Sequence, residues 1–203
     1  MFWIFHYWMP KLFIWSYLKW HNPKYYWIAI PIFVLAIAYI RFVEFGEPKY
    51  CLYVLSELDT EFNRNQRLQT KFPWVNDIEY VENRSQKLTL SKKDKKNIKL
   101  TFDYLWAEVV TNYPNVSKVD VTVLNHSYVL DIPVVTDDED MLAMATTFGI
   151  ETMKTLDLLA IMLKCGHITI EKVRQIVAYW AYLPDKPINF FEDYTRLFNE
   201  TPP

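Results

Sequence analysis

Carboxylate side chains stand where predicted strands end or predicted helices begin. Glu57 follows a β-like run, Asp137 and Asp138 follow the short β-branched run Ile132–Thr136, and Asp120 opens a further predicted helix. In open parallel sheets, functional groups gather beyond the carboxyl ends of the strands, so we expect these acids at one sheet edge. Carboxylate oxygens are the ligands that Mg²⁺ and Mn²⁺ prefer, and such an ion can activate water for attack on a phosphodiester.

The same acids also have a purely structural interpretation. Asp and Glu near the start of a helix serve as caps and as favourable partners of the helix dipole. The pattern of acids alone leaves the metal site and the capping role both open.

A basic patch opens another predicted helix and consists of Lys92, Lys93, Lys95 and Lys96. Its charge can steer a phosphate backbone without reading sequence. A solvated helix start with no partner is the alternative. Because the net charge of the chain is -2, any surface for nucleic acid must be local.

Several function classes are disfavoured by composition. The chain has three glycines, too few for a Gly-rich phosphate loop, and no serine lies in a nucleophile-elbow motif. Cys51 and Cys165 lie far apart without metal-ligand spacing, which is typical of ordinary thiols in a reducing compartment. We therefore expect a cytoplasmic protein.

The first 45 residues are rich in tryptophan and poor in acids. Within them, residues 25–40 form an uncharged apolar run between Lys24 and Arg41. The run is shorter than the ~20 residues that a membrane-spanning helix needs, and Pro31 interrupts it. A helix packed against the core is the favoured interpretation, and membrane contact through residues 25–40 is the alternative.

Strand-like and helix-like segments alternate along the rest of the chain. This order predicts an α/β fold with a parallel central sheet and helices on both faces. Strands are expected within residues 50–55, 132–136 and 150–154, and a polar loop or hairpin over residues 72–91. The predicted organisation is an aromatic N-terminal segment (1–45), an α/β domain (46–183) and a C-terminal surface extension (184–203).

Four segments together resemble a known family. They are Leu55–Asp59, the stretch from Ser117 to Asp120, the stretch from Ile132 to Met141, and residues 155–168 with their Thr-Leu, Leu-Leu and Gly-His-Ile elements. Their order and spacing resemble the PIN-domain nucleases over roughly residues 50–183.

This resemblance implies a Mg²⁺- or Mn²⁺-dependent RNA endonuclease, toxin-like and controlled by an antitoxin-like partner protein, with a homodimer as a further expectation. It implies metal roles for Glu57, Asp120 and Asp138. Asp137 is then a catalytic neighbour or substitute, and Thr136 a polar helper in binding RNA together with the four lysines.

One element of the family pattern is missing. PIN nucleases carry a first acid at the end of their opening strand, whereas Trp15 occupies the matching position here. A weakened PIN-fold module that binds RNA or protein without cutting is therefore the alternative function, with membrane attachment through residues 25–40 as a third. The retained acids favour the nuclease.

Overall fold

The computed structural model describes residues 26–29, 45–46, 50–83, 89–181 and 186–203. Its strands are β1 (Tyr26–Ala29), β2 (Tyr50–Tyr53), β3 (Val134–Val135) and β4 (Thr152–Met153). Its helices are α2 (Ser56–Arg64), α3 (Gln66–Lys71), the 3₁₀ helix η2 (Pro73–Asn76), α4 (Ile78–Asn83), α5 (Lys92–Asn112), α6 (Lys118–Leu130), α7 (Glu139–Phe148), α8 (Thr155–Lys164), α9 (Ile170–Ala181) and α10 (Phe190–Phe198).

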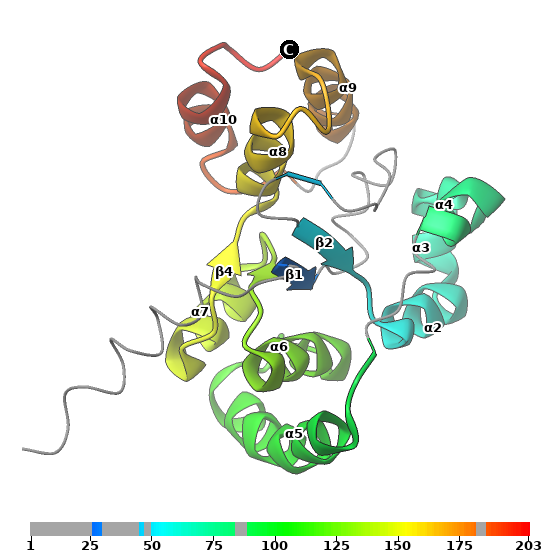
Figure 1. The fold of residues 1–203 in the computed structure, drawn as a ribbon, viewed down its shortest axis with the longest axis vertical. Coiled ribbons are helices and arrows are strands. Elements are labelled where there is room, and N and C mark those ends of the chain that lie inside the picture. The colour runs from blue at the N-terminus through cyan, green and yellow to red at the C-terminus, as the bar shows by residue number, and fades with distance from the viewer. Residues whose placement is uncertain (1–25, 30–44, 47–49, 84–88, 182–185) are drawn as a thin grey trace, which may run out of the picture.

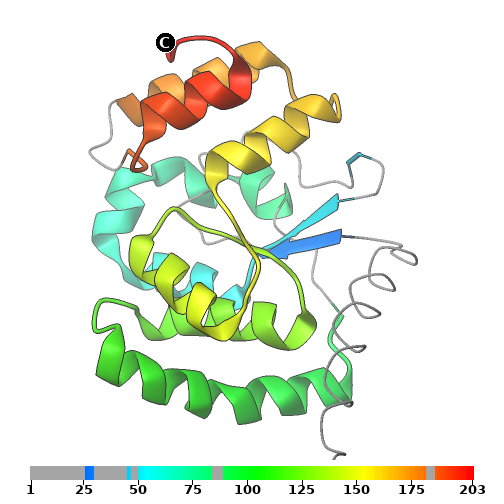
Figure 2. The same cartoon turned by 90° about the vertical axis from the view of Figure 1, so that its left-hand side faces the viewer.

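The helices gather into groups around a few short strands. α5 and α6 lie side by side at one end of the molecule, and α8, α9 and α10 lie together at the other (Figures 1 and 2). α2, α3 and α4 form a third group that follows β2.

The predicted α/β fold with a parallel central sheet and helices on both faces is wrong, because the described chain is mostly helical and its sheet is minimal. Only β1 and β2 pair over four residues, and they do so in parallel. β3 meets β1 through the single pair Ala29↔Val134 and meets β4 through two pairs. The expected strand over 132–136 shortens to Val134–Val135. Pro133 before it has no N–H to donate to a neighbouring strand. Thr136 after it still donates its N–H to the Met153 carbonyl at 2.9 Å.

The predicted core helix over residues 25–40 is also wrong at its start, since Tyr26–Ala29 forms strand β1. Residues 30–40 and Trp15 lie outside the described residues, so the expectation for Trp15 stays a prediction. Among the described residues, no helix combines the length and the apolar character needed to cross a membrane.

Helices α5 and α6 begin at capping boxes. The Ser91 hydroxyl accepts from the Asp94 backbone N–H at the start of α5, and the Asp94 carboxylate accepts from the Ser91 N–H in return. Ser117 and Asp120 form the same capping box at the start of α6. Such reciprocal bonds satisfy backbone N–H groups that lack partners inside the helix, so the sequence fixes where these helices begin.

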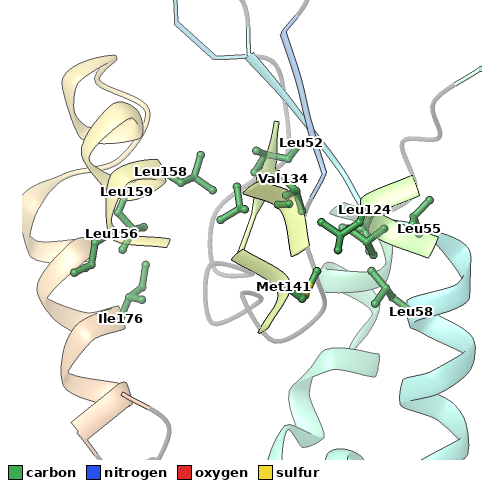
Figure 3. Close-up of a cluster of buried hydrophobic side chains, with 14 of the residues drawn as sticks. Leu52, Leu55, Leu58, Leu124, Val134, Met141, Leu156, Leu158, Leu159 and Ile176 are labelled. Carbon is green, nitrogen blue, oxygen red and sulfur yellow. The ribbon is translucent and has the colours of Figure 1, made fainter. Parts of the chain in front are cut away.

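The hydrophobic core joins the helix groups to the strands. Around Leu124 of α6, Figure 3 shows Leu55 and Leu58 at the start of α2. Leu52 of β2 and Val134 of β3 lie further along the same core. Leu156, Leu159 and Ile176 bring α8 and α9 into it. This continuous core holds the starts of α2, α6 and α7 in fixed relation.

The region expected as a polar loop or hairpin, residues 72–91, instead contains η2 and α4. The C-terminal residues, expected as a surface extension, form α10, whose Phe190 and Tyr194 are buried. The Tyr194 hydroxyl donates to Oε1 of Glu200 at 2.6 Å. Arg174 of α9 holds the same carboxylate through two guanidinium bonds. These contacts fasten the tail to α9.

This fastening is expected to depend on pH. The hydrogen bonds from Arg174 and Tyr194 lower the pKa of Glu200 from its ordinary 4.5 to about 2. Because the folded pKa is depressed, the stabilisation is present above pH ~4.5 and is lost as the pH falls towards 2.

Glu200→Gln should therefore lower the melting temperature near neutral pH. The gap in melting temperature between this variant and the wild type should close as the pH falls. Glu151→Gln, at an exposed carboxylate, is the control and should leave the melting temperature unchanged. A gap that does not change with pH would contradict this assignment.

Candidate functional site

Asp120 lies in the first turn of α6 and uses one carboxylate oxygen for the capping box. Its Oδ2 accepts from the Ser117 backbone N–H at 3.0 Å. Among the described residues, Oδ1 of Asp120 has no hydrogen-bond partner. One oxygen of a partly buried carboxylate therefore remains for another ligand.

Asp138 is the N-cap of α7 and is used in a similar way. Its Oδ1 accepts from the Met141 backbone N–H at 2.8 Å, and its own N–H donates to the Thr136 hydroxyl at 3.2 Å. Oδ2 of Asp138 has no hydrogen-bond partner within the part of the chain that the structure describes. The side chain is exposed, so this second oxygen is accessible.

Polar contacts tie the start of α6 to α7. The Asn115 side-chain amide donates to Oδ2 of Asp140 at 2.9 Å, which links the turn before α6 to the first turn of α7. The hydroxyl groups of Tyr113 and Thr147 lie 2.7 Å apart and form a second link. The segment before α6 is therefore fastened to α7, the helix that Asp138 caps.

Glu61 of α2 joins these two acids, and we call Glu61, Asp120 and Asp138 the three-acid cluster. Burial raises the pKa of Asp120, and the negative charge of Asp138 raises it further, against the lowering effect of the hydrogen bonds from Ser117. Burial also raises the pKa of Glu61, with Asp120 as the second cause. Like charges that disfavour one another's ionisation are typical of sites that bind a cation.

Sequence reasoning placed Glu57 in this set and missed Glu61. Glu57 is exposed and accepts from the hydroxyl of its neighbour Ser56 at 3.2 Å. Helical spacing was the signal in the sequence that could have pointed to Glu61. Residues four apart share a helix face, and Glu61 lies one turn after Glu57. Glu61, which interacts with Asp120, is therefore the residue of α2 that the electrostatics favour.

The acids do not form a closed metal cage. Within the described ranges, no group of three or more His, Cys, Asp or Glu side chains is arranged to hold a metal ion. The metal roles predicted for Glu57, Asp120 and Asp138 therefore stay predictions.

Asp137 links the end of β3 to the start of α8. Its carboxylate accepts from the backbone N–H of Thr155 at 3.2 Å and from the Thr155 hydroxyl. Burial raises its pKa, partly offset by these bonds and by Lys154. Thr136 is buried, and its hydroxyl contacts the Met141 sulfur and accepts from the Asp138 N–H. Asp137 thus fastens the end of β3 to α8, and Thr136 positions Asp138 from within the core.

The four lysines lie away from the three-acid cluster. α5 and α6 run in opposite directions: Asn125 of α6 donates to the Ile98 carbonyl at 2.7 Å, while the Lys118 ammonium lies 5.3 Å from the Trp106 ring centre. The start of α6 is therefore level with Trp106, and Lys92, Lys93, Lys95 and Lys96 lie at the opposite end of α5. At ~1.5 Å per residue, they are at least ~15 Å away along the axis. Their predicted contact with RNA stays a prediction that this position does not favour.

No family model, curated protein or solved structure matches this chain. The resemblance to PIN-domain nucleases stays a prediction that rests on sequence motifs.

The two aspartates fit one kind of metal site. Mg²⁺ usually keeps several waters and takes one or two protein carboxylates rather than a dedicated protein cage. Asp120 and Asp138 each offer one oxygen without a partner among the described residues, and their mutual repulsion would be relieved by a cation. The donor set therefore suits a hydrated Mg²⁺ or Mn²⁺.

Proposed function

We propose that this protein is a divalent-metal-dependent RNA endonuclease that acts at the three-acid cluster. The observation that carries the proposal is that the partly buried Asp120 of α6 lies within electrostatic reach of Glu61 of α2 and of Asp138 before α7. Burial is the main cause of the raised pKa values of Glu61 and Asp120, and these neighbouring charges add to it. Helices α2, α6 and α7 supply one acid each, so the fold positions the cluster although the acids lie far apart in sequence.

Each side chain has a distinct role in this proposal. Asp120 and Asp138 would hold the ion through the carboxylate oxygens that their caps leave over. Bound there, Mg²⁺ or Mn²⁺ would activate water and neutralise charge on the phosphodiester. Glu61, whose raised pKa brings proton uptake nearer to neutral pH, would accept a proton from the attacking water. The caps keep both aspartates in place.

A binding module that holds RNA or a protein partner without cutting is the second candidate. The observation that favours it is the lack, among the described residues, of a group of three acids arranged around one ion. Such a site would bind an ion weakly, and the protein would then act through recognition alone. Control by an antitoxin-like partner and assembly as a homodimer remain proposals that accompany the nuclease.

A cleavage assay separates the two candidates. Purified protein should cut labelled RNA in the presence of Mn²⁺ or Mg²⁺, lose this activity in EDTA and regain it when Mn²⁺ is restored. Gel analysis of the products measures the rate. Binding of the same RNA without any metal-dependent cleavage would favour the second candidate, and cleavage that persists in EDTA would rule out the proposed metal chemistry.

A further inference from the structure

An open hollow of about 650 Å³ lies beside Glu61. Its walls come from α2, from the start of α3 and from Val119, the residue next to Asp120 on α6. Glu61 is therefore shared by the hollow and the three-acid cluster. A chain that passed through the hollow would reach the cluster directly.

Two arginines line this hollow, Arg64 at the end of α2 and Arg67 in α3. Both side chains are exposed, and neither forms an ion pair with any residue that the structure describes. Glu57 and Glu61 line the same hollow, yet no salt bridge joins them to the arginines. Two guanidinium groups therefore remain available to an anionic ligand.

The backbone holds these arginines on one elbow of the chain. Asn65 interrupts the helix between them, and its side chain accepts from the backbone N–H groups of Arg67 and Leu68. The Gln69 amide donates back to the carbonyls of Phe62 and Asn63. Because α2 and α3 are tied together in this way, Arg64 and Arg67 line the same hollow from one fixed elbow of the backbone.

We propose that Arg64 and Arg67 bind a backbone phosphate of single-stranded RNA, next to the phosphate that lies at the three-acid cluster. The inference rests on the proposed nuclease function. A guanidinium offers paired donors that match phosphate oxygens, which makes arginine suited to this contact. A flexible single strand can bend into a hollow confined to one elbow. The polar side chains of Asn65 and Gln66 in the same wall suit the ribose of that strand.

The charges around the hollow explain why the contact of a phosphate with Arg64 and Arg67 would set the path of the RNA strand. The two carboxylates of the hollow offset the two arginines, so the region has no net attraction for polyanions in general. Only a strand that places a phosphate within reach of the guanidinium groups gains from them. Arg64 and Arg67 are therefore positioning residues for the substrate and take no part in bond breaking.

The test measures RNA binding by fluorescence anisotropy, with a short labelled single-stranded RNA in EDTA, so that cleavage is not required. The double variant Arg64→Gln/Arg67→Gln should weaken binding roughly tenfold per arginine, the usual effect of losing a charged hydrogen bond. Its slope of log affinity against log salt should become shallower by about 0.7, because the two arginines contact one phosphate and each phosphate contact on a single strand contributes ~0.7.

The matched control is Lys99→Gln/Lys164→Gln, which removes the same charge from exposed positions of α5 and α8 and should leave affinity and slope nearly unchanged. If both double variants lose the same RNA affinity, the proposal is overturned. It is also overturned if the wild type does not bind RNA in EDTA. Cleavage by the arginine variant with an unchanged KM would also overturn it while leaving the nuclease function intact. Arginine-dependent binding without any metal-dependent cleavage would retain this site and reject the nuclease.

Discussion

Asp120→Asn is expected to reduce metal-dependent RNA cleavage by more than ~100-fold, since loss of a supporting group alone often lowers metal affinity 10- to 100-fold and here a ligand itself is changed. The fold should survive, because the asparagine carbonyl can still accept from the Ser117 N–H in the capping box. The single-turnover cleavage rate and the Kd for Mn²⁺ by calorimetry measure the effect.

The same substitution is expected to raise the melting temperature of the metal-free protein. The raised pKa of Asp120 means that the folded state binds this proton more tightly than the unfolded chain does. Stability of the metal-free protein therefore falls as the pH rises from the ordinary value of 3.8 through the raised pKa. A neutral asparagine removes this unfavourable charge, and it should also remove the rise in melting temperature that Mn²⁺ gives the wild type.

Asp103→Asn is the matched control, because Asp103 is an exposed aspartate of α5. It should preserve cleavage, Mn²⁺ affinity and the Mn²⁺-dependent rise in melting temperature. If Asp120→Asn keeps full cleavage or lowers both activity and metal-free stability, Asp120 supports the fold and the proposed site is incorrect.

The start of α5 and the end of α7 show what local sequence predicts well. Ser91 with Asp94 gives α5 its capping box, and Gly149, at a φ of +65°, ends α7. These signals are local, because each involves residues within one helical turn. They fix where a helix begins or ends, and sequence inspection therefore finds them.

The strands and the third acid depended on more distant contacts. β3 is limited to Val134 and Val135 although its sequence is strongly β-branched, since its length is set by what it pairs with. Tyr26–Ala29 was expected as helix because apolar periodicity cannot separate a short apolar strand from a helix. Glu61 could be recognised as a site residue only from the structure, because the packing of α6 near α2 places Asp120 within electrostatic reach of it.

The structure of the C-terminal tail also depends on contacts between residues that lie far apart in the sequence. The sequence predicts a surface extension over residues 184–203, yet Tyr194 is fully buried and its hydroxyl donates to Glu200. The partner of Glu200 is Arg174, on a different helix. A pairing across 26 residues cannot be read from local composition.

Leu124→Ala is expected to lower the free energy of unfolding by about 2–5 kcal/mol, the usual result of emptying a leucine site in a packed core. Leu124 has no exposed surface and lies on α6 one turn after Asp120, beside Leu55 and Leu58 of the α2 region (Figure 3). A cavity there would loosen the contact that keeps Glu61 of α2 near Asp120. We therefore expect weaker Mn²⁺ binding in addition to the loss of stability. Urea unfolding measures the loss of stability, and calorimetry measures the Mn²⁺ affinity.

Leu100→Ala is the matched control, since this leucine of α5 is 64% exposed and its truncation should change stability by less than ~0.5 kcal/mol. If the two alanine variants lose the same stability, α6 does not pack on α2 through Leu124, and the three-acid cluster loses its structural support.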